Sequence, residues 1–138
     1  MASFVYDSAK EYIADGSIDL KDHSFRVMLL AAAHTPAKDT HTVKADVVGN
    51  EVSGAGYTAG GSALTSSFAR STVTVKFDAD DVVLTGLAPD WRYAVIYDDT
   101  HANDALVALL DPGSLQQPAG TNIKLTFNAS GIVTLTDG

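Results

Sequence analysis

Cysteine is absent from the 138 residues, and basic side chains and long apolar runs are scarce. Without cysteine the chain has no disulfide, no thiol nucleophile and no cysteine-ligated zinc. Nine Lys and Arg stand against 17 Asp and Glu, which gives a formal net charge of -8. We therefore expect no nucleic-acid partner, because neutralising phosphates requires clustered basic side chains. No apolar run reaches the roughly 20 residues of a membrane-spanning helix, so we expect no membrane partner.

Glutamate is also scarce, since 15 of the 17 acidic residues are Asp. Asp favours turns and helix caps, whereas Glu favours helix interiors. The chain is rich in Thr and Val, with 13 of each, and it contains 11 Gly. This composition predicts short strands joined by turns, and the length and lack of a linker predict one domain over residues 1–138. The first residues do not resemble a secretory signal, so we expect no export by that route.

One amphipathic helix is predicted at the start of the chain, over Phe4–Asp15. Ser3 precedes it and is expected to cap its first turn. Apolar residues recur at helical spacing along it, at Val5, Ala9, Tyr12 and Ile13. We expect this stripe to cover one side of a sheet or, alternatively, to dock on a partner subunit. Gly16 follows the helix, where a left-handed residue is common.

The rest of the chain predicts strands. Two segments are apolar enough for the core, Phe25–Ala31 and Trp91–Tyr97, and the first is expected to form a hairpin with Ile18–Leu20. Further strands are expected at Ser62–Phe68, Thr72–Asp78 and Ala105–Leu110, and a closing hairpin joins Asn122–Phe127 to Ile132–Thr136 across residues 128–131. Val43–Val48 fits either a short strand or a helical turn. The predicted fold is mainly β: an antiparallel β-sandwich or barrel-like domain of about eight or nine short strands with one N-terminal helix.

The residues that could support chemistry form no recognised motif. The glycine-rich stretch Asn50–Gly61 lacks the Lys of a phosphate-binding loop, so we expect it to serve backbone geometry. The four His residues fall in predicted loops at His23, His34, His41 and His101, where we expect ordinary surface side chains. No nucleophile motif or carboxylate pair suited to glycoside hydrolysis stands out. We therefore predict no enzyme, no catalytic residue, no cofactor and no metal site.

The densest carboxylate cluster is Asp78, Asp80 and Asp81. We expect a solvated turn there, because Asp is a common turn residue. A weak Ca²⁺ site is the alternative, since three carboxylates around one turn supply the oxygen ligands that Ca²⁺ prefers.

The chain resembles, over nearly its full length, a family of small tailed-bacteriophage virion proteins. The resemblance rests on Gly16–Leu20, Phe25–Leu30, Thr35–His41, Asn50–Gly61, Phe77–Val82, Arg92–Asp99 and Phe127–Ile132. Its most specific part is the string E-V-S-G-A-G-Y-T-A-G-G at Glu51–Gly61. After the D-A-D-D-V string of residues 78–82, relatives often have an apolar or aromatic residue, and this chain has Val83–Leu84. The chain departs from relatives at Ala108–Gly113, where they tend to carry a Gly-Tyr-Ile-Asp-Phe-Gly-like strand.

The resemblance implies a structural, non-enzymatic component of a phage particle, assembled in the host bacterial cytoplasm and located in the virion. Its first implication is a capsid decoration (cement) protein that binds the outer capsid surface, with the major capsid protein and copies of itself as partners. The alternative is a tail, baseplate or fibre-associated structural protein with a neighbouring tail protein as partner. A virion-associated glycan hydrolase is the remote alternative.

Overall fold

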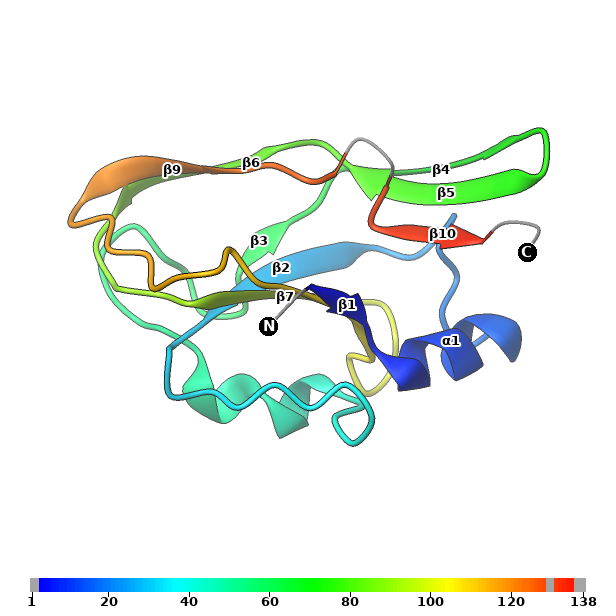
Figure 1. The fold of residues 1–138 in the computed structure, drawn as a ribbon, viewed down its shortest axis with the longest axis horizontal. Helices are drawn as coiled ribbons and strands as arrows, with labels where there is room; N and C mark the ends of the chain where they lie inside the picture. The colour runs from blue at the N-terminus through cyan, green and yellow to red at the C-terminus, as the bar shows by residue number, and fades with distance from the viewer. Residues whose placement is uncertain (1–2, 129–130, 136–138) are drawn as a thin grey trace.

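Two layers of antiparallel strands form the body of the protein in a computed structural model that describes residues 3–128 and 131–135. The first layer is a five-stranded sheet with the order β1 (Phe4–Val5), β8 (Leu106–Leu110), β7 (Tyr93–Asp98), β2 (Phe25–Leu30) and β3 (Ser62–Ala63). The second layer combines the sheet β10 (Val133–Leu135), β5 (Thr74–Ala79), β4 (Ser66–Ser71) with the ribbon β6 (Val82–Leu87), β9 (Thr121–Leu125). Figure 1 shows helix α1 (Asp7–Ala14) and the 3-10 turns η1 (Lys44–Asp46) and η2 (Val48–Asn50) on the side of the first layer away from the second.

The predicted mainly β fold with one N-terminal helix is confirmed. The described residues form ten short strands, slightly more than the eight or nine expected, and their sheets do not close into a barrel. The sequence pattern did not indicate β1 or β6, and the predicted strand Ser62–Phe68 is divided between β3 and β4. Ile18–Leu20, which was expected to be a strand, is not one. In the described part of the chain, no helix is long and apolar enough to cross a membrane.

The two segments predicted for the core form its central strands. β2 and β7 pair over six residues, from Phe25 opposite Asp98 to Leu30 opposite Tyr93. Almost every side chain on both strands is buried, because the second layer covers one face and α1 with the 3-10 turns covers the other. Phe25 and Phe77 join the layers, with ring centroids 4.8 Å apart and edge-to-face geometry.

The hairpin predicted between Ile18–Leu20 and the central strand is wrong, since β2 pairs with β7 and β3 instead. The Asp19 carboxylate accepts the backbone N–H groups of Lys21 and Asp22 at 2.9 and 3.0 Å. This turn bends the chain where a strand would have continued. Ile18 and Leu20 are buried all the same, so their alternation reflects core packing rather than strand pairing.

The helix begins at Asp7 rather than Phe4, because Phe4 and Val5 pair with Leu109 and Ala108 as strand β1. The predicted Ser3 cap is therefore wrong, and Ser3 Oγ accepts the N–H of Asp111 at 2.9 Å. The stripe is confirmed in its helical part, where Ala9 is buried and Tyr12 and Ile13 pack against the core. Gly16 follows the helix at φ +85°, as expected.

The closing hairpin is also wrong. β9 pairs with β6, and β10 pairs with β5, so the two segments lie in different parts of the second layer. Residues 129–130 of its predicted turn and Thr136 of its last strand lie outside the described residues. Val133 instead lies opposite the fully buried Phe77, so β10 packs its apolar side chain into the core.

Two other segments differ in detail from their predictions. Thr72 and Val73 join β4 to β5, so the turn follows the expected position at Ala69–Ser71. The ambiguous Val43–Val48 segment takes the helical alternative as η1 and the start of η2, while Val43 bridges to Ala105.

Candidate binding groove

An apolar groove of about 780 Å³ opens where the β1–β8 side of the first layer faces β9 of the second. The first layer supplies residues from β1, β7 and β8. The second layer supplies β9, the segment that follows it and the residues just before β10. The aliphatic and aromatic residues of the lining are Phe4, Val5, Trp91, Ala94, Ala108, Leu110, Ile123, Leu125, Phe127 and Ile132.

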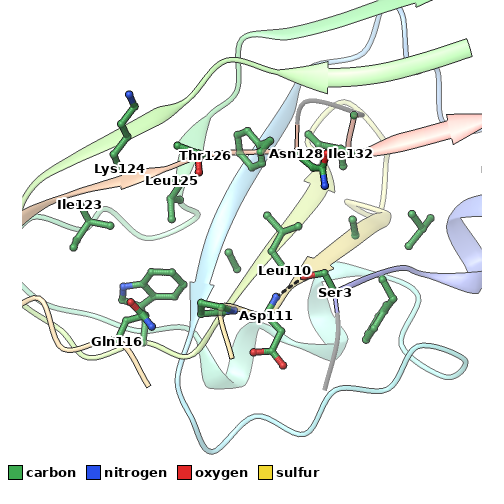
Figure 2. Close-up of a pocket in the computed structure, with 18 of the residues that line it drawn as sticks. Ser3, Leu110, Asp111, Gln116, Ile123, Lys124, Leu125, Thr126, Asn128 and Ile132 are labelled. Atoms are coloured by element: carbon green, nitrogen blue, oxygen red, sulfur yellow. Dashed lines mark hydrogen bonds between the residues drawn. The ribbon is translucent and has the colours of Figure 1, made fainter. Parts of the chain in front are cut away.

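Strand alternation on β9 decides which side chains enter the groove. Figure 2 shows Ile123 and Leu125 on the side of β9 where Leu110 lies, while Lys124 between them points the opposite way. Lys124 forms an ion pair with Asp81, with Nζ and Oδ2 3.2 Å apart on the outer surface. The wall that β9 contributes is therefore apolar, although the strand itself contains a charge.

Polar groups gather at one end of the groove, and most of them are satisfied internally. The Asp111 carboxylate lies 3.1 Å from the guanidinium of Arg92 and also accepts the N–H of Gly113 at 2.8 Å. Trp91 is held by two backbone hydrogen bonds with Gln116, of 3.0 and 2.7 Å. The Trp91 side chain is buried, and its indole Nε1 has no hydrogen-bond partner among the described residues. Nε of Arg92 is likewise buried without a partner among the described residues, so two unpaired donors lie at this end of the mainly apolar groove.

The glycine-rich string forms a different structure, a loop locked onto the central sheet. The Glu51 carboxylate accepts the hydroxyl of Tyr57 at 2.6 Å and the N–H of Gly60 at 2.7 Å. The Tyr57 hydroxyl in turn accepts the N–H of Leu29 on β2 at 3.1 Å. Burial, and then the hydrogen bond with Glu51, raise the pKa of Tyr57 far above its usual value, so it stays protonated.

Two glycines of this string are required by close backbone approach. A Cβ at Gly61, where φ is +83°, would overlap the carbonyl oxygen of Val27. A Cβ at Gly56, where φ is +79°, would overlap the carbonyl oxygen of Gly86. The carbonyl of Gly60 accepts the hydroxyl of Tyr97 at 2.5 Å. The expectation that this stretch serves backbone geometry is confirmed, because its polar groups bond to the fold itself.

His23 is paired with a buried acid, which corrects the expectation that it is an ordinary surface histidine. The Asp98 side chain is fully buried, and His23 Nδ1 donates to its Oδ2 at 2.5 Å. The other oxygen, Oδ1, accepts the N–H groups of Thr100 and His101 at 2.9 and 3.1 Å. The carboxylate is therefore saturated by the loop after β7, and the pair holds the Asp19–His23 turn against that strand.

His34 is a second departure from the surface expectation, since it is only 4 % exposed. Its ring lies 5.5 Å from that of His41 and 5.8 Å from that of Tyr93, measured between centroids. Nε2 of His34 and Nδ1 of His41 are buried without a hydrogen-bond partner in the described part of the chain. Burial lowers the pKa of His34, and the hydrogen bond of its Nδ1 with Asn50 Oδ1 only partly opposes this effect.

Asp78, Asp80 and Asp81 lie where β5 ends and β6 begins, which is the turn that their sequence predicted. Asp78 Oδ1 accepts the N–H of Ala79 at 2.8 Å, and Asp81 is occupied by Lys124. Within residues 3–128 and 131–135, no three His, Asp or Glu side chains come together in a metal-binding arrangement. The calcium alternative therefore finds no such cluster among the described residues.

The groove was not predicted, because its walls come from strands far apart in the sequence. The available signal was the apolar alternation of Ile123 and Leu125, which indicates a buried face but not what faces it. The aromatic residues Tyr6, Trp91, Tyr93 and Tyr97 are buried in the core. Comparisons with protein-family models, curated proteins and solved structures find no match to this chain.

Proposed function

We propose that this chain is a structural protein of a tailed-bacteriophage virion, and specifically a capsid decoration protein without enzymatic activity. The proposal is supported by the string Glu51–Gly61, which is the most specific part of the resemblance to small phage virion proteins. The residues of this string make contacts within the fold, since Glu51 binds Tyr57 and Gly61 lies against β2. A sequence pattern used in this way supports a shared scaffold rather than a shared catalytic centre.

The groove supports a binding role for this scaffold. Its floor is apolar, and its acidic residue Asp111 is neutralised by Arg92. An exposed apolar concavity of this size in a chain with a net charge of -8 is an expected place for contact with another protein. In this proposal the groove receives an apolar segment of the major capsid protein, while the acidic outer surface keeps the copies soluble before assembly.

The abundance of the chain in particles tests the proposal. Quantitative mass spectrometry of purified virions whose genome encodes the chain would give its copy number relative to the major capsid protein. A ratio between about one third and one is expected for a coat held by repeated interfaces. A ratio of a few per cent would assign the chain to the tail instead, and absence from virions would overturn the structural role.

The role of the groove is tested with two matched variants of the β6–β9 ribbon. Ile123 points into the groove, whereas Val83 lies opposite Lys124 on the outer face and is exposed. Ile123→Lys should abolish co-sedimentation with capsids that lack the protein, and Val83→Lys should leave it unchanged. Circular dichroism and Trp91 fluorescence of both variants separate a binding defect from a folding defect. Equal binding by the two folded variants would remove the groove from the proposal.

A further inference from the structure

The strand β4 forms an open edge of the second layer. It pairs with β5 on one side, and no strand of the described chain lies on its other side. Ser71 and Thr74 close the two-residue turn, and Asp80 donates its N–H to the carbonyl of Thr65 at 2.9 Å. Alternation along an antiparallel pair then directs the backbone N–H and C=O groups of Ser66, Phe68 and Arg70 away from β5. These groups are available to another strand.

This edge lacks the features that block strand addition. β4 reads S-S-F-A-R-S, with no Pro, no bulge in its register with β5 and a single charge. All but one of its residues are exposed, and Figure 1 shows the β4–β5 hairpin extending at the margin of the second layer. Natural proteins protect such edges with charges, prolines or covering loops. An unprotected edge of six residues is therefore a candidate site for pairing with another chain.

Exposed apolar side chains are concentrated on the same sheet. Phe68 on β4, Val73 in the turn and Leu135 on β10 are 40, 64 and 50 % exposed. Phe68 lies opposite Phe77, so it shares the face that carries the core residues of β5. Leu135 and Val75 are opposite each other and extend that face toward the turn. A neighbour added at β4 would continue these apolar rows.

The distribution of charge indicates which neighbour fits. The 26 residues from Val52 to Phe77 contain no Asp or Glu, although the whole chain contains 17. The same segment contributes Arg70 and Lys76. Two copies with a net charge of -8 each repel one another over most of their surface. They can approach along β4 without opposing carboxylates, because the one carboxylate of the hairpin, Asp78, lies on β5 opposite Ser67.

We propose that β4 pairs antiparallel with β4 of a second copy, about a two-fold axis at Phe68. In this register Phe68 meets Phe68 of the second copy, and Ser66 meets Arg70 of the second copy. All three outward-facing residues of each strand are then paired, and no like charges are opposite each other. The two three-stranded sheets become one six-stranded sheet through an isologous interface. This inference does not depend on the proposed function, since it rests on the edge, the apolar rows and the charge of the hairpin.

Sedimentation equilibrium and light scattering of the purified chain test the association. The expected mass is twice 14.4 kDa at high concentration and decreases on dilution. Phe68→Lys places two like charges at the axis, and Arg70→Pro removes an outward N–H without affecting the ladder with β5. Both variants should be monomeric, while Val83→Lys on the separate β6–β9 ribbon should remain dimeric.

Cross-linking tests the register, because the chain has no native cysteine. Hydrogen-bonded antiparallel partners have Cα atoms about 5.5 Å apart, which suits a disulfide. Oxidised Phe68→Cys should therefore give a covalent dimer, and oxidised Val83→Cys should not. A wild-type chain that stays monomeric up to about 1 mM, a dimer unaffected by Phe68→Lys and Arg70→Pro, or equal cross-linking of the two cysteine variants would each overturn the proposal. The proposal would also be overturned if the chain bound an acidic protein at β4 but did not associate with a second copy of itself.

Discussion

Replacing Gly61 by alanine measures how much stability depends on the close packing of the glycine-rich loop against β2. Gly61 is buried at φ +83°, and an added Cβ would overlap the carbonyl oxygen of Val27. The left-handed conformation costs an L-residue about 1 to 2 kcal/mol. Relieving the overlap requires a backbone shift, which costs about 1 to 3 kcal/mol in a packed interior. We therefore expect Gly61→Ala to lower the free energy of unfolding by about 2 to 5 kcal/mol.

Gly16 provides the matched control for this prediction. Its φ of +85° is nearly that of Gly61, but a Cβ there would meet nothing within 4 Å. Gly16→Ala should therefore lose only the conformational part, about 1 to 2 kcal/mol. Urea unfolding followed by the fluorescence of Trp91, which is 4 % exposed, measures both variants. Equal losses in the two variants would refute the close approach of Gly61 to β2.

Three further predictions concern single side chains. Thr72 is a β-branched residue at φ +52°, so Thr72→Asn should stabilise the chain by about 0.5 to 1 kcal/mol in thermal unfolding, and a loss of stability would contradict a strained turn. His23→Ala leaves Oδ2 of the buried Asp98 side chain without its hydrogen-bond partner and should cost about 3 kcal/mol in urea unfolding. The double variant His23→Ala/Asp98→Asn should recover part of this loss, and no recovery would argue against the pair. Burial lowers the pKa of His34, so the unfolded chain binds a proton first as the pH falls below about 6.5. Stability should therefore decrease between pH 7.5 and 5.5, less so in His34→Gln, and equal slopes in the two proteins would exclude His34 as the cause.

Features that depend on local pattern could be predicted from the sequence. The continuously apolar segments of β2 and β7 indicated central strands, because only a strand covered on both faces needs apolar side chains at every position. The helical stripe at Ala9, Tyr12 and Ile13 and the left-handed Gly16 could also be predicted. In each case the structure is decided by residues that are close in the sequence, so the pattern of those residues is sufficient to predict it.

The candidate site could not be predicted in this way. The groove needs β1, β8 and β9 together, and β9 was expected to pair with β10 rather than β6. The histidines were expected to be surface residues. Instead, His34 packs against Tyr93, and His23 is hydrogen-bonded to the buried Asp98. Loop residues carry no periodic signal of burial, so only the folded arrangement identifies them.

The amino-acid sequence by itself determined which segments are apolar enough to be buried and that the chain folds mainly as β-strands. The tertiary structure decided which strands become neighbours. Phe4 and Val5 pair with β8 instead of extending the helix, and Val133 pairs with the fully buried Phe77 of β5 instead of with the neighbouring strand β9. The alternation of apolar and polar residues specifies which face of a strand is buried, but it does not specify which strand pairs with it. The groove and the open β4 edge both follow from that choice of partners.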